Sequence, residues 1–238
     1  MDDFDRFVAP RTPTASRPLL GLTVLVVEDS RFASEAMRLL CLRSGARIRR
    51  ADCLRSAHRH LQVYRPSVVI IDLGLPDGSG TDLIRELADA SPRVEAILGT
   101  SGDDNSEKMA LDAGADGFLA KPITNLATFQ EAILAHISSD HQPNGPRELN
   151  NEDISPDPIA YRDDMTHVAD ILGDQSEDRT LDYVAQFVTG VARSAHDHTL
   201  EAAGIALATT RKAGRPARSD VARIAGLVQE RIAEKIAI

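Results

Sequence analysis

Aromatic and sulfur-containing side chains are scarce in this chain of 238 residues. Tryptophan is absent, and aromatic residues make up only 4% of the sequence. We therefore expect a core of valine, isoleucine, leucine and alanine, and little capacity to stack rings on nucleic-acid bases. Cys41 and Cys53 are the two cysteines, and neither belongs to a CxxC or Cys/His metal pattern. They are expected to behave as small apolar side chains in a reducing compartment.

The sequence also lacks long apolar runs. No run approaches the roughly 18 residues of a membrane-spanning helix, and the first ten residues, MDDFDRFVAP, are acidic where a signal peptide is basic. We therefore expect a cytoplasmic protein with no membrane partner. The net charge of −9 makes the whole chain a poor ligand for DNA, although residues 205–238 hold seven basic side chains and three acidic ones. Only this stretch could favour a polyanion.

Short apolar segments alternate with helical periodicity through the first half of the chain. The pattern predicts strands over residues 22–27, 47–50, 67–72, 94–100 and 117–120, and helices over residues 30–44, 54–64, 80–90, 105–113 and 124–138. Ser30 suits a helix N-cap, and Gly45 suits a helix end. Residues 47–50 are polar, which is typical of an edge strand. This alternation predicts an α/β fold with a doubly wound, five-stranded parallel sheet, (βα)5, of the flavodoxin-like type.

The chain divides into four parts by composition. Residues 1–18 hold three prolines and are expected to form a disordered tail, followed by the α/β domain over residues 19–138. Residues 139–158 are rich in Pro, Asn, Asp and Glu and predict a flexible linker. Residues 159–238 predict a small all-helical domain.

Within that last domain, helices are expected over residues 161–172, 179–207 and 219–236, with the long middle helix broken near Gly190 or Gly204. The candidate caps are Asp174, Ser219 and Asp220.

Charged and hydroxyl side chains follow the predicted strands. Glu28 and Asp29 come directly after the first strand, Asp72 ends the third, Thr100 and Ser101 end the fourth, and Lys121 follows the fifth. The carboxyl ends of parallel strands share one edge of the sheet, where ligands bind in open α/β folds. Crowded carboxylates repel unless a cation joins them, and Mg²⁺ prefers such oxygen ligands. One carboxylate could then attack a phosphoryl group whose charge is neutralised by Mg²⁺ and Lys121.

Four segments carry a family resemblance: VLVVEDS (24–30), VVIIDLGLPDGSG (68–80), LGTSGD (98–103) and GADGFLAKP (114–122). Together they resemble the receiver domain of bacterial two-component response regulators, over about residues 21–138. The resemblance implies that Asp72 is the phosphoacceptor and that the Lys121–Pro122 peptide is commonly cis. It further implies a metal held by Glu28, Asp29, Asp72 and the backbone carbonyl of Gly74, a phosphate-binding ammonium at Lys121, a switch hydroxyl at Thr100 and a switch aromatic at Phe118.

Two of these roles have rivals on the sequence alone. Ser101 is adjacent to Thr100 and competes for the switch hydroxyl, and Phe118 could equally be a core ring. Gly74, two residues beyond the phosphoacceptor, offers no side chain to orient or block an attacking water. The lifetime of a phosphoaspartate is therefore left open.

The resemblance implies a response regulator of a phosphorelay rather than a metabolic enzyme. Its phosphodonor would be a sensor histidine kinase or a histidine phosphotransfer protein, and its only chemistry would be self-catalysed phosphoryl transfer and dephosphorylation. A haloacid-dehalogenase-like phosphatase also uses an aspartyl nucleophile and Mg²⁺. That family wants a DxD pair at the end of the first strand, where this chain has Glu28-Asp29-Ser30.

Three interpretations of the helical domain stay open. The favoured one is a bundle for homodimerisation or partner docking, because an apolar stripe with no chemistry on it is typical of a core or interface. The stripe comprises Phe187, Val188, Val191, Ala195 and Leu200.

The second interpretation is a degenerate histidine phosphotransfer bundle. ARSAHDHTLEAAG at 192–204 places His196 and His198 on a helix, and His198 fits the register better. Glu201 and Ala202 stand where that family usually has lysine and glycine.

The third, not favoured, is a DNA-binding helix-turn-helix. RSDVARIAGLVQERIAEKI at 218–236 resembles the first helix and turn of lactose-repressor-type domains. Basic residues nearby would suit phosphate contacts, but Glu230 and Glu234 lie on the second helix, where base-reading residues are needed.

Overall fold

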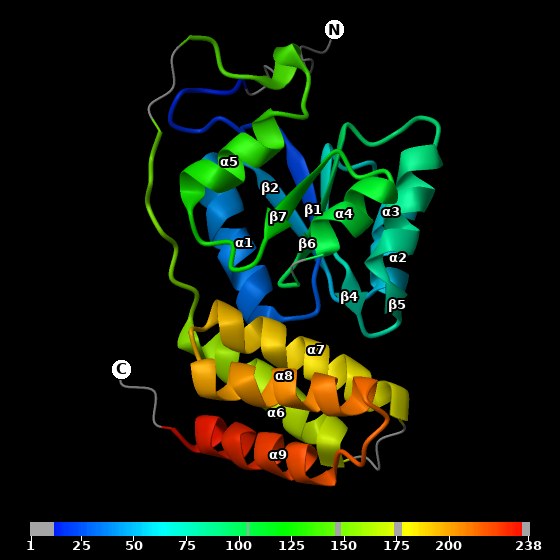
Figure 1. Ribbon diagram of the computed structural model, residues 1–238. Helices are drawn as coiled ribbons and strands as arrows, with labels where there is room; N and C mark the ends of the chain where they lie inside the picture. Colours follow the sequence, from blue (N-terminus) through cyan, green and yellow to red (C-terminus); the bar gives the residue numbers. More distant parts are fainter. Residues whose placement is uncertain (1–11, 104, 146–148, 174–177, 235–238) are drawn as a thin grey trace, which may run out of the picture.

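A five-stranded parallel sheet forms the centre of the N-terminal half (Figure 1). The computed structural model describes residues 12–103, 105–145, 149–173 and 178–234. The strand order is β2-β1-β3-β6-β7, with β1 at Thr23–Val27, β2 at Arg47–Ala51, β3 at Val68–Asp72, β6 at Ala96–Ser101 and β7 at Gly117–Ala120. This order confirms the predicted flavodoxin-like sheet and places the polar β2 at an edge. The order reverses between β1 and β3, which opens a crevice at their carboxyl ends.

Five helices cover the two faces of the sheet. Alternate residues of β1 face opposite sides: Val24 and Val26 pack with α1 (Arg31–Ser44) and α5 (Leu126–Leu134), whereas Leu25 and Val27 pack with the other helices. Those other helices are α2 (Leu54–Val63), α3 (Gly80–Asp89) and α4 (Ser106–Asp112). A short hairpin of β4 (Gly74–Leu75) and β5 (Gly78–Ser79), which periodicity did not predict, follows β3 directly.

The predicted ends of α1 are confirmed. The Ser30 side chain accepts a hydrogen bond from the Ala33 N–H, and Gly45 ends the helix with a left-handed φ of 85°. Gly45 suits this conformation because it has no Cβ. Helix α1 therefore begins at Arg31, with only its N-cap Ser30 between it and the acidic pair Glu28 and Asp29.

In the described residues of the C-terminal domain, four helices pack as a bundle below the carboxyl edge of the sheet (Figure 1). They are α6 (Pro158–Gly173), α7 (Asp178–Ser194), α8 (His198–Lys212) and α9 (Arg218–Ala233). The bundle core includes Met165, Val184, Val188, Leu200, Leu207 and Ile224. Most of the predicted apolar stripe therefore serves the interior of the bundle.

The predicted break in the helical segment over residues 179–207 is present, but its predicted position is wrong. The chain turns between α7 and α8, where His196 has a left-handed φ of 58° and Asp197 caps α8 by accepting the Leu200 N–H. The break lies at neither Gly190 nor Gly204. A Cβ at Gly204 would lie 2.4 Å from Oγ1 of Thr189, so this glycine lets α7 and α8 approach closely.

The predicted caps of the last helix are also corrected. Helix α9 begins at Arg218, so Ser219 and Asp220 lie inside its first turn and neither is the N-cap. Asp174 lies outside the described residues, as do residues 1–11 of the predicted tail.

Part of the predicted linker is fixed against the α/β domain. A short 3₁₀ helix, η1, covers Ser139–His141, and Ile154 is buried in the core beside α5. The N–H of Leu126 donates to the Glu152 carbonyl, and the N–H of Ile154 donates to the Thr124 carbonyl. Within the described ranges, no helix is both long enough and apolar enough to cross a bilayer.

Candidate functional site

Three carboxylates meet at the crevice between β1 and β3. Each of Glu28, Asp29 and Asp72 offers one oxygen, and these oxygens all lie within 4.8 Å of one another. Glu28 and Asp72 are buried, and Asp29 is half-buried. The convergence predicted from the strand ends is therefore present, and the donor set of closely spaced carboxylate oxygens fits a small hard cation such as Mg²⁺.

Lys121 lies against two of these carboxylates. Its Nζ is 2.7 Å from Oδ2 of Asp72 and 2.7 Å from Oε2 of Glu28. Its side chain is only 7% exposed, and the Lys121–Pro122 peptide is cis, as the resemblance implied. Lys121 thus brings one buried positive charge to a cluster of three acidic groups.

The charges of this cluster are not balanced. Burial, together with the neighbouring Asp72 carboxylate, raises the pKa of Asp29 to about 7, although the hydrogen bond from Tyr183 lowers it. Burial likewise holds the pKa of Glu28 well above its usual value, although Lys121 lowers it. Burial lowers the pKa of Lys121, but the Asp72 and Glu28 carboxylates outweigh this and raise it above its usual value. A divalent cation would supply the missing positive charge.

The two carboxylate oxygens of Asp72 accept hydrogen bonds from different donors. Oδ2 accepts from Lys121, whereas Oδ1 accepts a 3.2 Å hydrogen bond from the Gly74 N–H. A Cβ at Gly80 would lie 2.0 Å from the Asp72 carbonyl oxygen, so glycine is required where α3 begins beneath the strand end. The glycine-rich segment after Asp72 therefore shapes the backbone around the carboxylate.

The structure separates the two candidate switch hydroxyls. Thr100 pairs in register with Asp72, is fully buried and donates a 2.7 Å hydrogen bond to the Leu119 carbonyl. Ser101 borders the cavity that contains Asp72 and Lys121. In this conformation Thr100 is thus engaged with β7, and its switch role stays a prediction.

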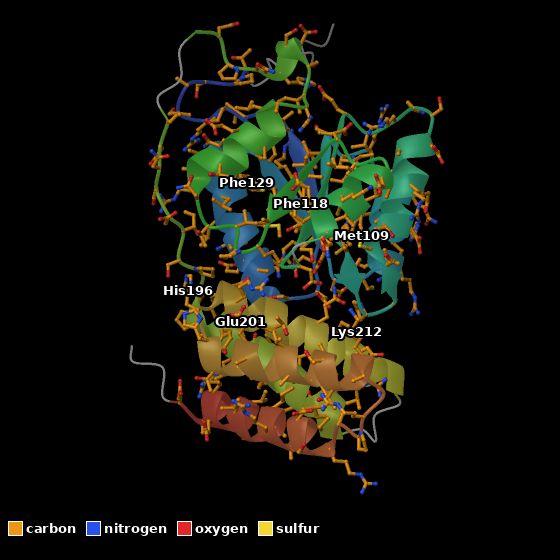
Figure 2. All side chains as sticks on the ribbon, in the orientation of Figure 1. Met109, Phe118, Phe129, His196, Glu201 and Lys212 are labelled. Atoms are coloured by element: carbon orange, nitrogen blue, oxygen red, sulfur yellow. The ribbon has the colours of Figure 1, made fainter. Side chains whose placement is uncertain are left out.

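Phe118 lies on β7, half-buried among apolar residues on the α4 side of the sheet (Figure 2). Its ring approaches Gly99 of β6. The switch role of this ring also stays a prediction.

Helix α7 supplies the opposite wall of the cavity, which the sequence did not predict. Asp29 Oδ2 accepts a 2.7 Å hydrogen bond from the hydroxyl of Tyr183. The guanidinium of Arg193 donates to the Gly102 carbonyl, at the end of β6. The α7 residues that line the cavity are Gln186, Phe187, Thr189, Gly190, Val191 and Arg193.

Helix α6 fixes the bundle beside the same site. Asp164 is 1% exposed; its Oδ2 accepts from the Ser30 hydroxyl at 2.8 Å and the Phe32 N–H at 3.0 Å, and its Oδ1 accepts from the Arg31 N–H at 2.8 Å. A carboxylate 133 positions further along the chain than Arg31 thus satisfies the free amides at the start of α1. Burial raises the pKa of Asp164 to about 6, although these hydrogen bonds lower it.

The two candidate histidines lie apart from this cavity. The His198 side chain is 85% exposed in the first turn of α8, with Glu201 at 3.6 Å, and neither histidine lines the cavity. Figure 2 shows His196 at the end of the bundle.

The helix-turn-helix alternative over residues 218–236, which the sequence did not favour, does not fit the part of it that the structure describes. Residues Arg218–Ala233 form one continuous helix, which Ile224 and Val228 anchor in the bundle core.

Comparisons with known proteins place the N-terminal half in a family. The model of the response regulator receiver domain matches residues 24–133. The KDP operon transcriptional regulatory protein KdpE of Escherichia coli (strain K12) is 35% identical over 99 residues, which are 42% of this chain and 44% of KdpE. Response regulator MprA of Mycobacterium sp. (strain KMS) is 31% identical over 143 residues, which are 59% of this chain and 62% of MprA.

One similar solved structure is the receiver domain of sensor histidine kinase PA1611 from Pseudomonas aeruginosa PAO1, with a magnesium ion in its active-site cleft. It is 24% identical, with a TM-score of 0.45, and the match covers 50% of this chain and 98% of that one. The chain itself spans between 44% and 62% of the two curated relatives. The family model identifies residues 24–133 as a response regulator receiver domain, and in the part of the chain that the structure describes a bundle of four helices follows it.

Proposed function

We propose that this protein is a response regulator of a phosphorelay that accepts a phosphoryl group on Asp72. The observation that carries the proposal is the pairing of Asp72 with Lys121 inside a cluster of three carboxylates. Glu28, Asp29, Asp72 and the Gly74 carbonyl would hold Mg²⁺, which neutralises phosphoryl oxygens when bound. The donor is a sensor histidine kinase or a histidine phosphotransfer protein, and the only chemistry is the regulator's own transfer and loss of phosphate.

In the transfer step, a carboxylate oxygen of Asp72 attacks the phosphorus of a phosphohistidine. The O–P bond forms, the N–P bond breaks, and the electron pair stays on the imidazole nitrogen of the donor. Lys121 is already charged and in place, so it stabilises the phosphoryl oxygens without further reorganisation.

The bundle is the output of this switch, and it lies across the route to Asp72. Tyr183 and Arg193 of α7 bond to the receiver at the cavity rim, and α7 lines the cavity itself. A protein donor must bring its histidine to Asp72 from that side, so donor docking and bundle docking exclude each other. Phosphorylation is thereby coupled to release of a bundle that dimerises or binds a partner.

Changes inside the receiver accompany release. The Thr100 hydroxyl must leave the Leu119 carbonyl before it can reach a phosphoryl oxygen, and Phe118 repacks beside it. The surface formed by α4, β7 and α5 then differs between the two states.

DNA binding by the C-terminal half is a second candidate. The relative KdpE is named a transcriptional regulatory protein, and residues 205–238 are net basic. The packing of α9 into the bundle disfavours it. A gel-shift assay across a salt series would support DNA binding if retention fell steeply with salt. A phosphotransfer role of His198 is likewise not favoured, and the cytoplasmic location stays a prediction.

The test of the main proposal is acyl-phosphate labelling of the full chain with acetyl phosphate and Mg²⁺, read by mass spectrometry. We expect one phosphoryl group on wild type and none on Asp72→Asn or when EDTA replaces Mg²⁺. Undiminished labelling of Asp72→Asn would place the acceptor elsewhere and overturn the proposal.

A further inference from the structure

The side chain of Gln186 fills the space that Gly74 leaves empty. A Cβ built at Gly74 would lie 2.1 Å from Nε2 and 2.8 Å from Oε1 of Gln186. The carboxamide from α7 therefore stands where the receiver's own side chain at position 74 would be. Gly74 is also the residue whose N–H donates to Oδ1 of Asp72, so this space adjoins the phosphoacceptor.

The carboxamide of Gln186 puts a polar group at the reaction site. Gln186 lines the same cavity as Asp72 and Lys121, and it is exposed, so water reaches it. Within the part of the chain that the structure describes, this carboxamide makes no hydrogen bond to another protein group. A residue needed only to fill space could be apolar, as Phe187 beside it is.

We infer that Gln186 is a catalytic residue for hydrolysis of the phosphoryl group on Asp72, supplied by the bundle to the receiver. This inference rests on the proposed function of Asp72. Oε1 accepts a hydrogen bond from the attacking water, and Nε2 donates to a phosphoryl oxygen. Together these two hydrogen bonds hold the water next to the phosphorus atom of phosphorylated Asp72.

The step balances with water as the sole co-reactant. The water oxygen forms a bond to phosphorus, and the bond between phosphorus and the Asp72 oxygen breaks. The electron pair of that bond returns to Asp72 as carboxylate, where Lys121 stabilises it. Both protons of the water leave with the product, dihydrogen phosphate.

If Gln186 has this role, the position of the bundle sets how long the phosphoryl group stays on Asp72. When the bundle is docked, Gln186 is in place and phosphate is lost quickly. When a partner holds the released bundle, Gln186 lies away from Asp72. Because Gly74 has no side chain to replace it, the phosphoaspartate persists. The bundle thus sets both access to Asp72 and the lifetime of its product.

The experiment labels the full chain with acetyl phosphate and Mg²⁺, removes the donor and follows loss of acyl phosphate over time. Gln186→Ala is expected to label but to lose phosphate about tenfold more slowly, or slower still. Gln186→Glu keeps the shape but sets a negative charge against the phosphoryl oxygens, and it is expected to be slow as well. Gln229→Ala, an exposed glutamine on α9, is the matched control and should lose phosphate at the wild-type rate.

A double variant separates chemistry from docking. Gly74 has no left-handed φ, so Gly74→Asn in the Gln186→Ala background returns a carboxamide to the same space from the receiver itself. Fast loss of phosphate should return. A double variant that labels but stays as slow as Gln186→Ala would assign the effect to docking and overturn the inference, as would a wild-type rate in Gln186→Ala. Failure of wild type to label would instead refute the proposed role of Asp72.

Discussion

The hydroxyl of Tyr183 donates a 2.7 Å hydrogen bond to Oδ2 of Asp29, which joins the helical bundle to an acidic residue of the receiver site. Burial and Asp29 both raise the pKa of Tyr183, so this hydroxyl stays a donor. The bond makes docking of the bundle depend on the same carboxylate that would hold the metal. Communication between the domains therefore has a direct physical basis in the site.

Removing this hydroxyl should loosen the bundle. A hydrogen bond to a charged group contributes about 1.5–3 kcal/mol, so Tyr183→Phe should raise the undocked population about tenfold or more. The amides of Arg31 and Phe32 report docking, because both donate to Asp164 of α6. Native-state hydrogen exchange at these two amides should accelerate by a similar factor. Unchanged exchange would show that the Tyr183 hydroxyl contributes nothing to docking.

Asp164 and Asp163 offer a matched pair of tests. Asp164→Ala removes a buried carboxylate that caps α1, and we expect a loss of about 2–3 kcal/mol in the free energy of unfolding. Asp163 pairs with Arg31 at 2.9 Å but is 41% exposed, so Asp163→Ala should cost less than about 1 kcal/mol. Urea denaturation of both variants measures the difference. Equal losses would contradict the capping role of Asp164.

The bundle should lose stability in acid through Asp197. Burial raises the pKa of this carboxyl, but hydrogen bonds from Arg231, Leu200 and Tyr161 outweigh it and hold the pKa at about 2. Because the folded pKa is depressed, the stabilisation is present above the unfolded value near 4 and is lost as pH falls toward 2. Asp197→Asn should therefore destabilise the chain by about 2 kcal/mol at pH 7 and by much less near pH 2. A penalty that does not shrink in acid would refute this assignment.

The receiver and its acidic cluster could be predicted from the sequence because strand ends are local signals. Glu28 and Lys121 each follow an apolar strand and Asp72 ends one, and a parallel sheet brings such strand ends together without further information. The choice of Thr100 over Ser101 as the switch hydroxyl rests on the resemblance, because the two residues are adjacent at an uncertain strand end and neighbouring side chains of a strand point to opposite faces.

The contribution of the bundle could not be predicted, because it depends on contacts between distant residues. Tyr183 lies 154 positions from Asp29 along the chain, and nothing in the local sequence of either marks the other. The turn at His196 was missed for a related reason: Gly204 read as a helix break, whereas it serves close packing against Thr189.

The most direct test of the account follows hydrogen exchange at the amides of Arg31 and Phe32 in the full chain, before and after phosphorylation by acetyl phosphate and Mg²⁺. Because Asp72 and the docked bundle share one face, phosphorylation should accelerate exchange at both amides, and the Asp72→Asn variant treated in the same way should show no change. Wild-type protein that carries the phosphoryl group on Asp72 yet keeps both amides fully protected would contradict the coupling of phosphorylation to bundle release.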